Sequence, residues 1–286
     1  MAEPLAKVVF FSRPFPRSAG RLARESVTFD GRDPAAFDRT IAGADLVIEV
    51  EQNDGASRFE WFAAAAPCPS AVWLIDTHLE EARHRAILGC YTHVFVAIRA
   101  HADALSALHP NVRWLPLCNT KPPLEAPVEP SIDVGFVGNE FAGHHERTRL
   151  LDWLQARLGS RLLRGQVHDP AAYVRTLASC RIAFNRSVHG TDTNYRIFEA
   201  MAAGAFVLTD RTPDAAALFR DGEQLAFYDG DDDALVQVER WLQDAPGRAR
   251  VARAGQAEVL ARHQWADRLT TIVNASLGTS FSRDDV

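Results

Sequence analysis

The chain has 286 residues, of which 47% are hydrophobic and 24% are charged, and its formal net charge is -6. This composition is typical of a folded globular protein and excludes a largely disordered chain. The length is long for one α/β domain and suits two modest ones. No stretch is dense in lysine and arginine, so we expect no binding to a nucleic-acid backbone.

The cysteines and the N-terminus give expectations about the cellular setting. The four cysteines, Cys68, Cys90, Cys118 and Cys180, are scattered and have neither a CxxC pair nor metal-ligand spacing. We expect reduced, mostly buried thiols, as in a cytoplasmic protein, and no resident metal or cofactor. The first residues lack a signal peptide's basic and apolar segments, and no apolar run is long enough to span a membrane.

Short apolar runs alternate with amphipathic segments in the first half of the chain. Strands are predicted at 8–11, 46–50, 71–75 and 94–97, and helices around 34–42, 57–66, 79–88 and 99–108. This alternation predicts a parallel sheet covered by helices on both faces. We assign residues 1–118 to an N-terminal, Rossmann-like domain.

Asp76 and His78 follow the third predicted strand directly. The sequence from Thr77 to Glu80 fits a capping box, which predicts that a helix starts there. Both side chains would then lie at the carboxyl edge of the sheet, where open α/β sheets bind ligands. They are candidates for a catalytic acid/base pair, and an equally good interpretation is that they only shape the turn.

The alternation stops and then restarts. Residues 119–131 contain four prolines, Pro122, Pro123, Pro127 and Pro130, which predicts a semi-rigid linker. Strands are then predicted at 132–138, 161–163, 181–184 and 205–208, with helices at 146–158, after Asp169-Pro170, at 195–203 and at 265–277. We assign 132–263 to a second Rossmann-like domain and expect 264–286 to pack back towards the first. Two such domains facing a central cleft are predicted.

The segment from Asn185 to Thr209 is the most informative for function. A strand enters a polar loop, and a short helix then leaves from Thr193 or Asn194. The unpaired N–H groups and the dipole of a helix N-terminus suit a phosphate. Arg196 lies in the first turn and Glu199 one turn later. In the simplest interpretation these two residues form only an i,i+3 ion pair on the surface.

The residues Arg196-Ile197-Phe198-Glu199-Ala200-Met201-Ala202-Ala203-Gly204 and the strand after them resemble the donor-site signature of GT-B glycosyltransferases. The resemblance is greatest to the CgeB-like, spore-maturation-type branch, which is similar to retaining family 4. Further similar segments are 133–139 with 147–151, 218–228 and 263–268. The resemblance covers roughly residues 112–275.

The resemblance implies a nucleotide-sugar site and roles for its residues. Glu199 would bind the ribose hydroxyls, Arg196 would contact the diphosphate, and the turn at Gly138 and Asn139 would approach the donor. Tyr173 to Cys180 would lead into the strand on the base side. The candidate donor-binding residues are Gly138, Asn139, Arg147, Arg186, Asn194, Tyr195, Arg196 and Glu199.

One position departs from the family pattern. A second glutamate is expected eight residues before the ribose-binding one, and Thr191 stands there instead. Asp192 or His189 are candidates to replace it in binding the donor sugar.

The resemblance implies a retaining, metal-independent transfer in which the leaving phosphate oxygen takes the acceptor proton. The acceptor, a protein, a glycan or a small molecule, would enter past Asp76, His78 and the loop 12–20. Two alternatives stay open: a non-catalytic nucleotide- or sugar-binding scaffold, and a sugar epimerase or phosphorylase of the same fold. The sequence indicates neither the base nor the sugar of the donor.

Overall fold

The computed structural model describes residues 7–11, 34–51, 59–140, 145–188 and 190–283. The chain divides into two compact units, one formed by Met1–Pro116 with Trp265–Val286 and the other by Leu117–Gln264. The loop 12–20 and the candidate His189 lie outside the described residues. Among the described residues, no helix combines the length and the apolar character needed to cross a lipid bilayer.

The first unit contains a parallel five-stranded sheet in the order β1-β2-β3-β4-β5. The strands are β1 (Val8–Phe11), β2 (Leu46–Val50), β3 (Ser70–Leu74), β4 (His93–Val96) and β5 (Val112–Trp114). The helices are α1 (Pro34–Ile41), α2 (Phe59–Ala65), α3 (Glu81–Ile87), α4 (Arg99–Ser106) and α11 (Trp265–Leu277), with a 3-10 turn at Leu88–Cys90. The predicted β-α alternation is confirmed, and β5 was missed because it has only three residues.

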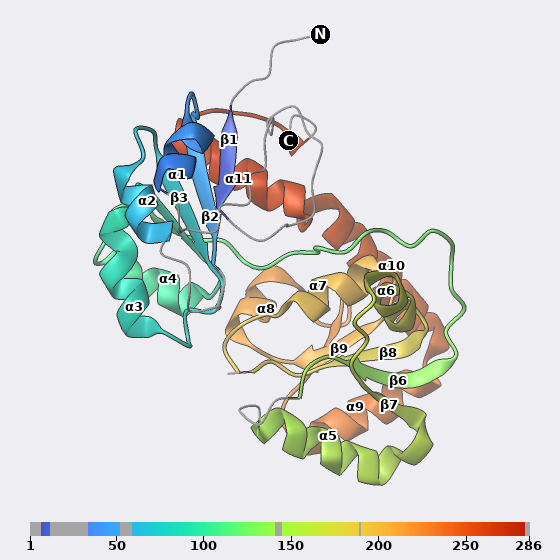
Figure 1. Cartoon of the computed structure of the whole chain (residues 1–286). Coiled ribbons are helices and arrows are strands. Elements are labelled where there is room, and N and C mark those ends of the chain that lie inside the picture. Colours follow the sequence, from blue (N-terminus) through green and yellow to red (C-terminus); the bar gives the residue numbers. More distant parts are fainter. Residues whose placement is uncertain (1–6, 12–33, 52–58, 141–144, 189, 284–286) are drawn as a thin grey trace. The chain divides into compact units, whose positions relative to one another are not determined.

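Both faces of the first sheet are buried, as the near-continuous apolar strands predict. Val72 and Leu74 pack into a core with residues of α2, α3 and α4. Trp73 points to the opposite face, where its ring stacks on Trp265 of α11 with centroids 5.8 Å apart. The Trp73 indole N–H donates to the carbonyl of Leu115 at 2.9 Å. Helix α11 therefore completes the core of this unit (Figure 1).

The capping box predicted at Thr77 is wrong. Helix α3 begins at Glu81, and its N-cap, Glu80, makes no side-chain capping bond. The Thr77 hydroxyl lies 2.7 Å from Nδ1 of His101 in α4, and residues 77–79 form a turn. A tertiary partner for the hydroxyl thus replaces the local one, which the spacing of residues in the sequence cannot reveal.

The second unit contains another parallel sheet, in the order β10-β9-β8-β6-β7. Its strands are β6 (Ile132–Val137), β7 (Leu162–Gly165), β8 (Cys180–Asn185), β9 (Val207–Asp210) and β10 (Ala226–Tyr228). Its helices are α5 (His145–Leu158), α6 (Pro170–Ala178), α7 (Tyr195–Ala202), α8 (Pro213–Leu218), α9 (Asp231–Gln243) and α10 (Ala245–Arg262), with a 3-10 turn at Gly159–Arg161.

Two local signals in this unit are confirmed. Asp169 caps α6 by accepting a hydrogen bond from the backbone N–H of Ala172 at 2.7 Å, with Pro170 as the first helical residue. Helix α7 ends before Gly204, whose φ of +81° lies in the left-handed region that favours glycine.

The order of strands reverses between β6 and β8. From β6 the chain moves outward to β7, and it then returns to place β8 on the other side of β6. Such a reversal opens a crevice at the carboxyl ends of the two strands, because the connections leave on opposite faces. Helices α5 and α9 cover one face, and α6 and α7 cover the other (Figure 1). The described strands of the first sheet follow chain order and have no such reversal.

Candidate functional site

Arg196 lies at the reversal point of the second sheet. Its Nε donates to the carbonyl of Val137, the last residue of β6, at 2.6 Å. Its Nη1 donates to Oδ1 of Asn185, the last residue of β8, at 2.8 Å. A residue from the first turn of α7 thus links the ends of the two strands that border the crevice.

A second guanidinium lies close to the first. Arg147 of α5 donates through Nε to the carbonyl of Arg186 at 3.1 Å and through Nη1 to the carbonyl of Asn139 at 3.2 Å. The Phe136 ring contacts both arginines, with its centroid 5.8 Å from Arg147 and 4.3 Å from Arg196. Burial, and then the charge of Arg196, lower the pKa of Arg147 to about 10. Two confined cations of this kind favour an anion beside them.

Gly138 makes the position of Arg196 possible. A Cβ atom on Gly138 would lie 1.7 Å from Nη2 and 2.7 Å from Cζ of Arg196, far inside contact distance. Glycine at this turn therefore serves close approach rather than an unusual backbone angle.

We expect Gly138→Ala to displace the guanidinium of Arg196 while leaving the fold intact, because the clash falls on the end of a flexible side chain. Loss of one charge-assisted contact predicts about a tenfold weaker affinity for a nucleoside diphosphate. Titration calorimetry measures the affinity, and the midpoint of urea unfolding checks the fold. Gly89→Ala is the control, because no atom lies within 4 Å of its added Cβ. Equal affinities for both variants would contradict the role given to Gly138.

Glu199 is buried, with 4% of its surface exposed, and its carboxylate is surrounded by donors. Oε1 accepts a hydrogen bond from the Thr120 hydroxyl at 3.0 Å, and Oε2 accepts one from the Tyr173 hydroxyl at 2.8 Å. The ammonium of Lys121 lies 3.6 Å from Oε1. Burial, and then the Glu199 charge, raise the pKa of Tyr173, so its phenol stays a proton donor.

The interpretation of Arg196 and Glu199 as only an ion pair on the surface is therefore wrong. Each side chain has its own partners, strand ends for Arg196 and hydroxyl groups for Glu199. The carboxylate accepts hydrogen bonds from two hydroxyl groups, which is also how a carboxylate would bind a vicinal diol.

Thr120, Lys121 and Tyr173 belong to the site although the sequence pattern did not single them out for it. Thr120 and Lys121 fall in the segment interpreted as a linker, yet the chain there is fixed to the second unit. The backbone N–H of Asn119 donates to the carbonyl of His263 at 2.8 Å, and its side-chain amide donates to Oε1 of Gln264 at 3.0 Å. The prolines that follow indicate a linker, and no local sequence pattern predicts that Asn119 is bonded to residues near the end of the second unit.

The start of α7 carries unsatisfied polar atoms. Asn194 is the N-cap residue but makes no capping bond, and its Nδ2 donates to Oδ1 of Asn185 at 2.9 Å. Within the described part of the chain, the buried Oγ1 of Thr193 and Oδ1 of Asn194 have no hydrogen-bond partner. Tyr195, the first helical residue, is partly exposed. Buried polar atoms without partners beside a helix N-terminus are typical of a ligand site.

Arg186 forms ion pairs with two carboxylates near the ends of β8 and β9. Its Nη1 lies 3.6 Å from Asp210, and its Nη2 lies 3.2 Å from Glu146. Burial acts to lower the pKa of Arg186, but the charge of Asp210 leads the effects that raise it overall. Asp210 also accepts the backbone N–H of Ser187 at 2.8 Å. Arg186 therefore joins the ends of β8 and β9.

Thr191 stands where the family pattern has a second glutamate, and it differs in exposure from its neighbour Asp192. Thr191 is exposed, and its carbonyl accepts the backbone N–H of Asp214 at 3.3 Å. Asp192 is buried, with 8% exposure, beside Thr193.

Asp76 and His78 lie in the first unit, at the carboxyl end of β3. Oε2 of the buried Glu51 accepts the backbone N–H groups of Ile75 and Asp76 at 2.7 Å and 2.9 Å. Glu51 in turn contacts Nε2 of His84 in α3. Burial alone would raise the pKa of Glu51, but its hydrogen bond and ion pair with His84 lower it overall. A charged, fixed carboxylate thus holds the backbone that leads into the Asp76–His78 turn.

Comparison with known proteins identifies the family. The family model described as "Glycosyl transferase-like" matches residues 124–274, more than half of the chain. The chain therefore belongs to this family, and it is a glycosyltransferase with the GT-B fold. Among curated proteins, none matches the sequence.

Solved structures resemble nearly the whole chain at low sequence identity. HepE of Anabaena, crystallised with UDP and glucose, is 14% identical with a TM-score of 0.65, and the match covers 94% of this chain and 98% of that one. Sucrose-phosphate synthase of Thermosynechococcus elongatus is 15% identical with a TM-score of 0.58, covering 92% and 86%. An α-glucosyltransferase bound to UDP and DNA is 6% identical with a TM-score of 0.60, covering 87% and 84%. These likenesses bear on the fold.

Proposed function

We propose that this enzyme transfers a sugar from a UDP-sugar to an acceptor, with retention of configuration and without a metal or other cofactor. The observation that carries the proposal is the buried carboxylate of Glu199 on the helix whose first turn supplies Arg196, at the reversal point of the second sheet. The choice of UDP is supported by the UDP and UDP-glucose bound to HepE.

Glu199 binds the two ribose hydroxyls in this proposal. Its oxygens already accept hydrogen bonds from Thr120 and Tyr173, so the carboxylate is oriented before the donor arrives. Each carboxylate oxygen has a second lone pair, so it can accept a ribose hydroxyl while keeping its present partner. Preorganisation of this kind reduces the entropy lost on binding.

Arg196, Arg147 and the start of α7 bind the diphosphate. Negative charge grows on the leaving diphosphate in the transition state, and fixed cations and N–H groups stabilise it there. Arg196 is held by its bonds to Val137 and Asn185, and Arg147 by its bonds to Asn139 and Arg186, so neither has to reorganise during the reaction. The leaving phosphate oxygen then takes the acceptor proton, so no strong protein base is required.

In this proposal, the acceptor binds beside Asp76 and His78. The bonds from Ile75 and Asp76 to Glu51 fix the backbone of their turn. A fixed turn at the carboxyl end of β3 can orient an acceptor hydroxyl, whereas a loosely held one would have to be ordered first.

A thermal-shift screen and a donor-hydrolysis assay test the proposal. UDP, GDP, dTDP, ADP and CMP are each added to the full chain, the stability gain is measured by thermal shift, and release of UDP from a UDP-sugar measures turnover. At about a hundred times its dissociation constant, a ligand adds about 2.7 kcal/mol of stability, a rise of a few degrees for a protein of this size. We expect UDP to give the largest shift and UDP-sugar to be hydrolysed slowly. UDP binding without any turnover would support a binding scaffold instead, and no response to any nucleotide would overturn the proposed donor site.

A further inference from the structure

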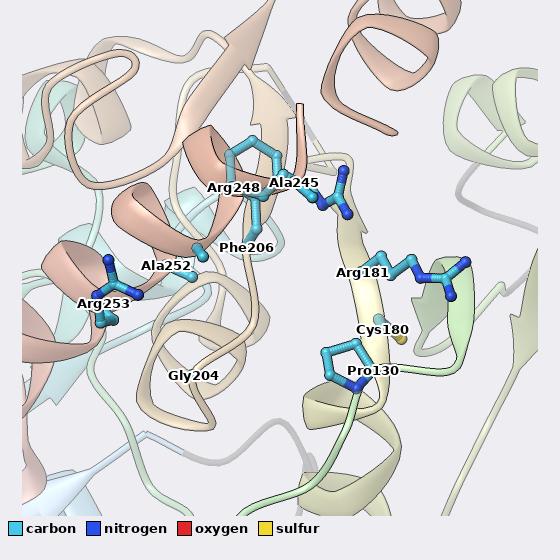
Figure 2. A pocket seen from close by; sticks show the side chains of 10 residues that line it. Pro130, Cys180, Arg181, Gly204, Phe206, Ala245, Arg248, Ala252 and Arg253 are labelled. Carbon is cyan, nitrogen blue, oxygen red and sulfur yellow. The ribbon is translucent and has the colours of Figure 1, made fainter. Parts of the chain in front are cut away.

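A pocket lined by arginines lies in the second unit, at the amino ends of its strands. Its volume is about 350 Å³, and its lining comes from the residues just before β6 and β9, the start of β8 and the first turns of α10. The donor site uses the carboxyl ends of these strands, whereas this pocket lies at their amino ends. We call it the amino-edge pocket (Figure 2).

The charged residues that line the amino-edge pocket are all basic. Its lining contains three arginines, Arg181, Arg248 and Arg253, and no aspartate or glutamate. In the view of Figure 2, Arg253 lies on one side of the pocket and Arg181 on the other. The chain as a whole carries a formal charge of -6, so three arginines in one lining are unusual for it, although Arg181 forms an ion pair with Asp133 beside the pocket.

Each arginine keeps donors for a ligand. Arg248 uses Nη1 to donate to the carbonyl of Leu242 at 2.8 Å and to that of Trp241, which leaves Nε and Nη2. Arg181 uses Nη1 to contact Asp133. Within the described residues, Arg253 has no hydrogen bond or ion pair. Burial, and then the charge of Arg181, lower the pKa of Arg248, while the charges of Asp244 and Asp133 act to raise it.

The rest of the lining limits the shape of the ligand. Cys180 and Phe206 are buried and apolar, and the remaining residues are alanine, glycine and proline. Burial raises the pKa of the Cys180 thiol to about 12, so it stays neutral. No hydroxyl or amide side chain is present to bind the hydroxyl groups of a sugar. The lining therefore suits a compact anion whose charge, rather than its hydroxyl groups, is recognised.

We propose that the amino-edge pocket is a second anion site, separate from the donor site, that takes a small phosphate-bearing ligand. Guanidinium groups bind phosphate oxygens through paired, charge-assisted hydrogen bonds, which suits a lining of three arginines. The volume is at the lower end of the range for small-molecule pockets and accommodates a pyrophosphate or a small phosphate monoester. A ligand there would bridge α10 and the amino ends of β8 and β9, so its binding would stabilise the second unit.

Calorimetry on full-length variants tests this site with pyrophosphate and, separately, glycerol 3-phosphate as probes. Arg253→Ala and Arg253→Glu are the informative variants, because Arg253 is exposed and its loss leaves the core intact. Arg250→Ala and Arg250→Glu are the matched controls, since Arg250 is also exposed on α10 but does not line the pocket. We expect about tenfold weaker binding for Arg253→Ala, a larger loss for Arg253→Glu, and little change for the controls.

Repeating the titration with Glu199→Ala and with Arg196→Ala distinguishes binding at the amino-edge pocket from binding at the donor site. Binding that survives in both of these variants and is lost in Arg253→Glu belongs to the amino-edge pocket, whether or not UDP proves to be the donor. Equal losses in the Arg253 and Arg250 variants would show a general effect of charge and overturn the proposal. Loss in Arg196→Ala alone, or no saturable binding at millimolar probe, would overturn it as well.

Discussion

Glu199→Ala is expected to weaken donor binding about a hundredfold or more while leaving the fold in place. The variant removes a buried carboxylate that accepts the Thr120 and Tyr173 hydroxyls and, in our proposal, both ribose hydroxyls. Hydrogen bonds to a charged group contribute about 1.5–3 kcal/mol each, so losing two predicts a fall in UDP affinity of about a hundredfold or more. Titration calorimetry with UDP measures the effect, and donor hydrolysis measures it in turnover.

Two further variants separate binding of the ribose from packing. Glu199→Gln keeps the shape of the side chain but loses the charge, so we expect an intermediate loss of affinity. Glu239→Ala removes a half-exposed carboxylate of α9 that pairs with Arg161 and should leave UDP binding unchanged. Wild-type affinity in Glu199→Ala would refute the ribose-binding role, and an equal loss in Glu239→Ala would point to a global effect.

A pH effect on stability around neutral pH is expected at Glu49 in β2. Burial raises the pKa of Glu49 to about 7, although its hydrogen bond from the Tyr91 hydroxyl acts in the opposite direction. The folded state therefore holds the Glu49 proton more tightly than the unfolded chain, where the pKa is about 4.5. This contribution to stability is fully present below about pH 4.5 and is lost as the pH rises through about 7. The difference corresponds to roughly 3 kcal/mol.

Glu49→Gln tests this linkage, because the amide is neutral at every pH and still accepts a hydrogen bond from Tyr91. We expect the variant and the wild type to have similar free energies of unfolding near pH 4. By pH 8 the variant should be more stable by roughly 3 kcal/mol, measured by urea denaturation followed by tryptophan fluorescence. Glu81→Gln, at an exposed position of α3, is the control. A constant difference between Glu49→Gln and wild type across this range would contradict the raised pKa.

Much of the fold was predictable from the sequence because its signals are local. Apolar runs of strand length and the amphipathic segments between them predicted the alternation in both halves. Asp169-Pro170 predicted the start of α6, and Gly204 the end of α7. The family resemblance at Arg196 and Glu199 led to the glycosyltransferase class that the family model supports. Two features were not predicted correctly: β5 and β10 are too short to stand out, and the Thr77 hydroxyl contacts a distant side chain, His101, instead of capping a helix.

The sequence by itself determined the two sheet-forming halves and the two side chains at the centre of the candidate donor site. Only the tertiary structure decided what surrounds them. Strand order, and with it the crevice between β6 and β8, depends on contacts between segments far apart in the chain. The bond from Thr120 to Glu199 spans 79 residues, and the bond from Arg196 to Val137 spans 59. Hydrophobic periodicity reports which face of an element is buried, but it carries no information about which distant element will cover that face.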